Sequence, residues 1–224
     1  MTITPQTLTR GAAAAAVAAG VTFIGVQIGH PHLDADSITT TEMTVRGSLK
    51  VLMAVLALAG ITGMYLSRVR RNGLLGLIGY LLFAGGYLLI MCTSYVSAFV
   101  LPAVAEADRD YVNSVLAVAS GGAADTEIGA LTILFRAQGF GYLAGGLVFG
   151  IALFRARVLA RWACVLLAVS GLASAVLSVM PDGFYRLIAF PNGIALIALG
   201  CSLWATARRT VPAAGERAVP EHAE

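Results

Sequence analysis

Long runs of apolar residues alternate with short polar segments along the 224 residues of this chain. A helix needs about 20 mostly apolar residues, rising ~1.5 Å each, to cross a hydrocarbon core of ~30 Å. A membrane β-barrel would show ~10-residue segments of alternating polarity instead. The pattern therefore predicts an all-α integral membrane protein, a bundle of six transmembrane helices over about residues 11–29, 49–66, 74–96, 128–154, 162–180 and 187–207.

The first of these runs, residues 11–29, is the least hydrophobic because it is rich in alanine. A cleaved signal peptide is the alternative interpretation of such a run. The residues that follow it, 30–34, contain no small-x-small cleavage site. We therefore expect the run to be retained as a membrane span.

Arginines mark every second junction between the apolar runs. They are Arg10, then Arg68, Arg70 and Arg71, then Arg155, Arg157 and Arg161, and finally Arg208 and Arg209. Basic residues collect in the cytoplasmic loops of membrane proteins. This placement predicts that both termini are cytoplasmic, in the inner (plasma) membrane of a bacterium whose high-GC genome is indicated by the arginine and alanine bias.

The longest loop on the predicted outer side, residues 101–127, has apolar residues at helical spacing. The spacing predicts a short amphipathic helix, which either lies on the outer surface or packs on the bundle as a lid. The chain ends in a polar stretch, 210–224, with two prolines and few apolar residues. We expect one transmembrane domain over 1–209 and a disordered cytoplasmic tail.

The composition agrees with a membrane protein and argues against several classes of function. The chain is 58% hydrophobic and 12% charged, against about a quarter charged in soluble domains. No basic soluble face suggests nucleic-acid binding, and no C-x-x-C pair, H-E-x-x-H or Walker A sequence is present. The sequence predicts no cofactor. It predicts contact with the lipid bilayer and leaves open a membrane protein partner or a homo-oligomer.

Polar residues inside two of the apolar runs are the first candidates for a site. Ionisable residues within a span are costly and often functional. A pathway or an anion-binding position could be formed by Arg136, Gln138, Arg186 and Asn192. The alternative for Arg136 is structural, because its long side chain can reach the outer interface or pair with an outer carboxylate.

The loop after the first run offers a second candidate, a metal site. Two imidazoles and two carboxylates occur within seven residues, at His30, His32, Asp34 and Asp36. These groups are ligands for zinc and other divalent ions. The spacing matches no established site, and a solvated loop with Pro31 and turn-forming aspartates accounts for the same residues.

Glycines at small-x-x-x-small spacing form a third group. They are Gly25 and Gly29 in the first run, and Gly141, Gly145, Gly146 and Gly150 in the fourth. Glycine lets two helices approach closely in lipid. We expect these residues to pack helices within the bundle, with a dimer interface as the alternative.

No single activity follows from these features. The leading hypothesis is a non-enzymatic accessory or interaction protein that acts through its outer loops and glycine faces. The alternatives are a small permease-like transporter with an outward-facing polar pathway, and a membrane enzyme with an outer histidine and acidic site.

Overall fold

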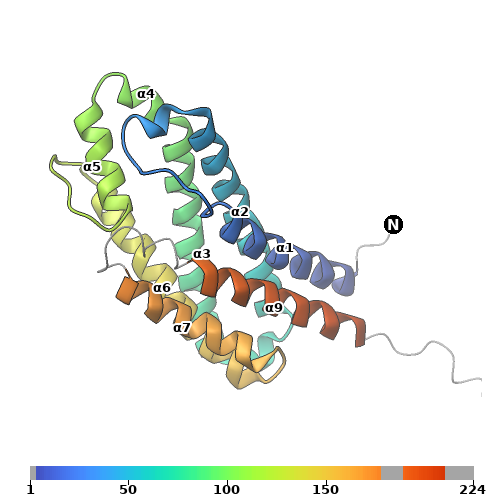
Figure 1. The fold of residues 1–224 in the computed structure, drawn as a ribbon. Coiled ribbons are helices and arrows are strands. Elements are labelled where there is room, and N and C mark those ends of the chain that lie inside the picture. The colour runs from blue at the N-terminus through green and yellow to red at the C-terminus, as the bar shows by residue number, and fades with distance from the viewer. Residues whose placement is uncertain (1–3, 178–188, 210–224) are drawn as a thin grey trace, which may run out of the picture.

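A computed structural model describes residues 4–177 and 189–209 of the chain. The described part is helical and contains no strand. Figure 1 shows long helices forming an elongated bundle, with two short helices at one end. In chain order the long helices are α1 (Pro5–Gly25), α2 (Thr41–Leu66), α3 (Val69–Phe99), α6 (Leu131–Ala156), α7 (Arg161–Leu177) and α9 (Ala189–Arg209).

Five of these helices are long and apolar enough to cross a membrane: α1, α2, α3, α6 and α9. They coincide with five of the six predicted spans. The remaining span corresponds to α7, an apolar helix of which the structure describes 17 residues. The predicted tail, 210–224, lies outside the described residues.

The largest differences from the predicted helix boundaries are in α1 and α2, and they have local causes. α2 begins at Thr41 instead of residue 49, because the Thr40 hydroxyl accepts a hydrogen bond from the Met43 amide and caps a polar first turn. α1 spans Pro5–Gly25 and not 11–29. Its start is capped by Thr4, and it ends before Gly29, which has a φ of 63° that suits glycine in a turn.

The alanine-rich helix α1 packs between α2 and α9. Ala13, Ala16 and Ala19 are completely buried. A Cβ atom at Gly60 of α2 would lie 2.7 Å from Ala16, and one at Gly200 of α9 would lie 2.7 Å from the Ala13 carbonyl. The alanines that lower the hydropathy of this helix are thus the residues that let its neighbours approach.

The first and last helices run antiparallel along each other, as Figure 1 shows for the blue and red ribbons. Gly20 meets Gly193 near one end of the contact. At the other end the Gln6 side chain donates a hydrogen bond of 2.8 Å to the Ala207 carbonyl. The first and last helices therefore bring both ends of the described chain to one end of the bundle, which we call the terminal end; the opposite end is the distal end.

Glycines also set the distance between α3, α6 and α7. A Cβ at Gly145 would lie 2.3 Å from the Phe83 amide nitrogen of α3, and one at Gly150 would lie 2.7 Å from the Ala168 nitrogen of α7. Gly141 faces Gly86 in the same way, and Gly146 lies against the Phe83 ring. The four α6 glycines singled out from the sequence all lie in such contacts.

The two glycines predicted to pack from the first run behave differently. A Cβ at Gly25 would meet no atom within 4 Å, and one at Gly29 would approach only the Arg46 side chain at 3.9 Å. Gly25 is the last residue of α1 and Gly29 lies in the turn beyond it. The small-x-x-x-small spacing here spans a helix end, so it does not create a helix-packing face.

The distal end carries a second, smaller hydrophobic core. The loop predicted to be amphipathic forms α4 (Leu101–Ala105) and α5 (Arg109–Ala119). Val112, Val115 and Leu116 of α5 are buried against Ile38 and Met43, from the segment between α1 and α2 and the start of α2. The helix therefore packs on the bundle, as the lid alternative expected.

Candidate functional site

A cavity of about 320 Å³ lies at the distal end, between the bundle and α5. This volume is within the range of roughly 300–1,000 Å³ typical of small-molecule sites. Helices α2, α3, α5 and α6 and the segment after α1 supply most of its wall. Helices α1, α4 and α9 contribute one residue each, which are Phe23, Leu101 and Ala189. Side chains far apart in the sequence therefore converge on one space.

Most of the wall is apolar, with a limited set of polar groups. The polar residues are Gln27, His30, Lys50, Thr93, Ser94, Ser97, Gln138 and Tyr142. The Thr93 hydroxyl lies 2.7 Å from the amide oxygen of Gln138, which joins α3 to α6 across the wall. A mainly apolar pocket with a few placed polar groups is the usual form of a ligand site.

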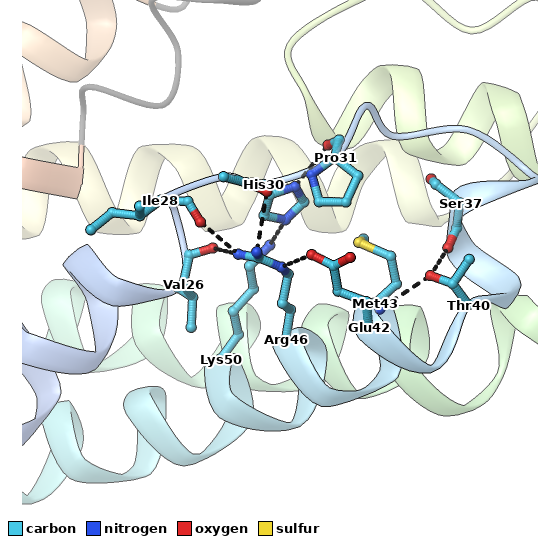
Figure 2. Close-up of polar contacts among 11 residues, drawn as sticks. Val26, Ile28, His30, Pro31, Ser37, Thr40, Glu42, Met43, Arg46 and Lys50 are labelled. Atoms are coloured by element: carbon cyan, nitrogen blue, oxygen red, sulfur yellow. Dashed lines mark hydrogen bonds and ion pairs between the residues drawn. The ribbon is translucent and has the colours of Figure 1, made fainter.

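Lys50 and His30 form the polar pair of the wall, shown in Figure 2. The Lys50 Nζ lies 3.0 Å from His30 Nε2, and His30 Nδ1 lies 2.9 Å from the Pro31 carbonyl oxygen. An ammonium group only donates and a carbonyl only accepts. With Lys50 as the donor, His30 Nε2 accepts the hydrogen bond, and the tautomer that carries its proton on Nδ1 then donates to the Pro31 carbonyl.

Arg46, one helical turn before Lys50, holds the end of α1 in place. Its guanidinium donates to the carbonyls of Val26, Ile28 and Gly29 at 2.9–3.1 Å, and to Glu42 at 2.9 Å (Figure 2). These carbonyls have no intrahelical partner at a helix C-terminus, where a positive charge also favours the helix dipole. Arg46 thus fixes the turn that places His30 beside Lys50.

Below the cavity, three helices share a buried polar cluster. Asn192 of α9 is 1% exposed and donates its side-chain amide to the hydroxyls of Tyr142 and Tyr87. Its amide oxygen has no hydrogen-bond partner among the described residues. Tyr142 also lines the cavity. Further towards the terminal end, Phe83 and Phe149 are fully buried in the core, and the Phe83 ring packs against Tyr142.

The structure brings together only part of the polar pathway expected from the sequence. Gln138 lines the cavity and Asn192 lies beneath it through Tyr142. Arg136 is exposed and is not among the residues that line the cavity. It is two residues from Gln138, and neighbours at that spacing do not share a helix face. Arg186 lies outside the described residues.

The four candidate metal ligands do not converge. His30 binds Lys50, while Asp36 forms an ion pair with Arg109 of α5. Asp34 accepts hydrogen bonds from the amides of Ser37 and Asp36, which lower the pKa of its carboxyl group, the Ser37 amide most strongly. Within the described part of the chain no group of three or more His, Cys, Asp or Glu side chains could hold a metal ion. The loop uses these residues for turns and for contact with α5.

Sequence reasoning missed Lys50, Arg46 and the two tyrosines as site residues. Lys50 is the single lysine of the chain and stands at the edge of the second apolar run, which was a usable signal. The roles of Arg46 and His30 depend on how the turn after α1 folds back onto α2. Comparisons with protein-family models, with curated proteins and with solved structures find no match to this chain.

Proposed function

We propose that this chain is a six-span protein of the bacterial plasma membrane that binds a small molecule in its distal cavity, without catalysing a reaction. The observation that carries the proposal is the cavity itself. It has the volume of a ligand site, and its walls combine apolar side chains with Lys50, Gln138 and Thr93. The cavity supports the leading hypothesis of a non-enzymatic protein that acts at its outer end.

The proposal includes the orientation of the bundle in the membrane. The arginine clusters lie at or near the terminal end, where Gln6 meets Ala207. The positive-inside rule would put that end in the cytoplasm and the cavity on the outer side. In this arrangement α7 is the sixth span, and its 17 described residues give ~25 Å of a ~30 Å core at ~1.5 Å per residue.

Cysteine labelling in intact cells tests the orientation. Ser97→Cys places a thiol on the cavity wall, in a background with the exposed Cys92 and Cys201 changed to serine. We expect a charged, membrane-impermeant thiol reagent to label it from outside. Tyr95→Cys, at an exposed position on the same helix, is the control for non-cavity sites. Labelling of Ser97→Cys only after permeabilisation would place the cavity on the cytoplasmic side and overturn the orientation.

Filling the cavity tests the binding function. Gly139 lines the cavity, and a Cβ there would meet no atom within 4 Å, so Gly139→Leu occupies the space without a backbone clash. Gly85→Leu is the matched control, because Gly85 is equally open but lies outside the cavity lining. Native mass spectrometry of protein from membranes should show a small-molecule adduct on the wild type and Gly85→Leu but not on Gly139→Leu. Equal adducts, or none on any form, would refute cavity binding.

Permease-like transport is a second candidate, favoured by one observation. The polar groups continue inward from the cavity, from Gln138 and Tyr142 to the buried Asn192, whose amide oxygen lacks a described partner. Polar groups at the middle of a bundle are typical of transporter sites. Uptake of the same small molecule into vesicles that is lost in Asn192→Leu, while binding persists, would establish transport. Binding without uptake would refute transport and support the binding function alone.

A further inference from the structure

We infer that the ligand of the distal cavity is a molecule with an apolar body and a hydrogen-bond acceptor oxygen, of a carbonyl or a hydroxyl group, and that the side-chain amide of Gln138 donates to this oxygen. This inference rests on the proposed function and specifies how the ligand is recognised.

The Gln138 side chain is held in place by Thr93, on the neighbouring helix. The Thr93 hydroxyl lies 2.7 Å from Gln138 Oε1, closer than it lies to the carbonyl oxygens of Leu89 (3.0 Å) and Ile90 (3.2 Å) in its own helix. A hydroxyl has one proton to donate, and the shortest of the three contacts is the one to Gln138. The amide oxygen is therefore occupied, and the two N–H groups on Nε2 remain as the donors of this side chain.

These two donors have no hydrogen-bond partner among the described residues, although Gln138 is half-buried and lines the cavity. Two other polar residues of the wall differ, because Lys50 contacts His30 and Tyr142 accepts from Asn192. Gln138 thus offers donors that a bound molecule can use without displacing a hydrogen bond within the described part of the protein.

The depth of Gln138 makes an unused donor costly. Gln138 lies ~10 Å along α6 from Leu131, and Thr93 lies ~9 Å along α3 from Phe99, at ~1.5 Å per residue. In the six-span arrangement α6 is ~39 Å long and extends a few Å beyond a ~30 Å core at each end, so the pair lies inside the core. A donor at this depth costs free energy unless an acceptor meets it. An acceptor oxygen on the ligand offsets that cost.

Apolar side chains flank Gln138 along both helices and decide the rest of the ligand. Ile90 and Leu143 lie about one turn further towards the terminal end, while Phe135 and Leu131 lie about one and two turns towards the distal end. Covering such surface favours an apolar molecule over a hydrophilic one. The wall is therefore matched by a ligand that is apolar on both sides of its acceptor oxygen.

Protection of a cavity thiol tests the inference. The Ser97→Cys protein described above, in nanodiscs of ether-linked phosphatidylcholine, which has no ester carbonyl, is treated with N-ethylmaleimide and its labelling rate is measured. The probes are 6-undecanone and undecane, which share one chain length and differ in one carbonyl oxygen. Their partitioning into lipid is the same for every variant, so a change in the ratio of their half-protecting concentrations reports the bond to the protein. Ser94→Cys is a second reporter on the same wall, should Ser97→Cys fail to fold.

Variants of the amide assign the effect to Gln138. Gln138→Met removes the amide at similar side-chain length and should lower the preference for the ketone about two- to tenfold, the effect of one neutral hydrogen bond. Arg136→Met is the matched control, because Arg136 is exposed and outside the cavity lining, and it should leave the preference unchanged.

Variants of Thr93 test how the amide is positioned, and they serve as the second test should Gln138→Met fail to fold. Thr93→Val removes the hydroxyl that holds the amide oxygen and should also lower the preference for the ketone. Thr93→Ser keeps a hydroxyl and should retain the preference. A preference unchanged in Thr93→Val would contradict the positioning by Thr93.

Nanodiscs of diester phosphatidylcholine distinguish the source of the oxygen. Gln138-dependent protection by this lipid, without added probe, identifies an ester carbonyl of a membrane lipid. Gln138-dependent protection by the ketone alone identifies a free molecule.

The outcomes separate this inference from the proposed function. A ratio of half-protecting concentrations that is the same in the wild-type residue background and in Gln138→Met would overturn the hydrogen bond while leaving cavity binding intact. Protection by neither probe nor the diester lipid would also overturn it. If Gly139→Leu then failed to remove an adduct as well, cavity binding would be refuted with it.

Discussion

The terminal and distal ends of this bundle are stabilised in different ways. At the terminal end and in the middle, helices meet through glycine and alanine, with Cβ clearances that leave no room for another atom. At the distal end, a short loop, α4 and α5 form a separate small core beside an open cavity, and side-chain hydrogen bonds hold the turns. In lipid, close packing replaces the hydrophobic drive between helices. At the distal end such contact continues between α2 and α3, where a Cβ at Gly47 would lie 2.7 Å from the Ala98 side chain, and the space for a ligand lies beside it.

The largest effect should come from enlarging a packed glycine. Gly145→Leu would put a side chain where even a Cβ lies 2.3 Å from the Phe83 backbone, so α3 and α6 must separate. Overpacking typically costs ~1–3 kcal/mol, and a backbone clash on this scale should reach the upper limit or exceed it. The free energy of unfolding, measured by SDS titration in mixed micelles, checks this. Gly85→Leu is the open control, and equal stability of the two variants would contradict the packing described here.

The next effect should come from Arg46. Arg46→Gln removes a charge and most of the donors to three carbonyls at the end of α1. Hydrogen bonds to charged groups contribute ~1.5–3 kcal/mol, so we expect a loss in that range. Hydrogen exchange should show faster opening of residues 24–30 than of the middle of α1. Uniform destabilisation along α1 would mean that Arg46 does not act on the turn.

Filling the cavity should change stability in the opposite direction. Gly139→Leu removes a glycine from a helix interior, where glycine costs ~1 kcal/mol relative to alanine, and adds apolar contacts in open space. We expect the same SDS titration to show unchanged or higher stability, by up to about 1 kcal/mol. The same substitution is thus expected to lower the free energy of unfolding at residue 145 of α6 and not at residue 139. A loss as large as that of Gly145→Leu would show that the cavity is closed.

The smallest effect concerns Asp34. The amides of Ser37 and Asp36 hold the pKa of its carboxyl group below the ordinary 3.8. Because the folded pKa is lowered, the stabilisation is fully present above the unfolded value and is lost as the pH falls through the folded value. Asp34→Asn should remove this acid sensitivity at pH values below 3.8, seen by hydrogen exchange of residues 34–38, and leave exchange at pH 7 nearly unchanged.

Most of the helices could be predicted from the sequence because the apolar run or periodicity that marks each helix lies within the helix itself. Five spans and the amphipathic α5 follow from runs and periodicity. The low hydropathy of α1 did not indicate how tightly it packs in the bundle. A transfer free energy is assigned to each alanine separately and does not include its packing against other helices. Ala13 and Ala16 matter through Gly200 and Gly60, on other helices, and no local pattern shows that pairing.

The candidate site was harder to predict because its members come from seven helices and a loop. Gln138 and Asn192 were found because polar residues stand out in apolar runs. Lys50 was missed, since it lies at the boundary of its run and gains its role from His30, twenty residues earlier. Arg136 stood out equally but faces outward, a matter of helix rotation that a nearly uniform apolar helix does not reveal.

The pairing of α1 with α9 has a consequence for biosynthesis. Helix α1 leaves the ribosome before α9, its neighbour in the bundle, and more than a hundred residues separate Gly20 from Gly193. At ~5–20 residues per second, translation keeps α1 waiting for on the order of ten to thirty seconds. Throughout that interval the surface that α9 will cover, around Ala13 and Gly20, remains available to lipid or to an insertion chaperone. The contact between α1 and α9 can thus form only after α9 has been translated.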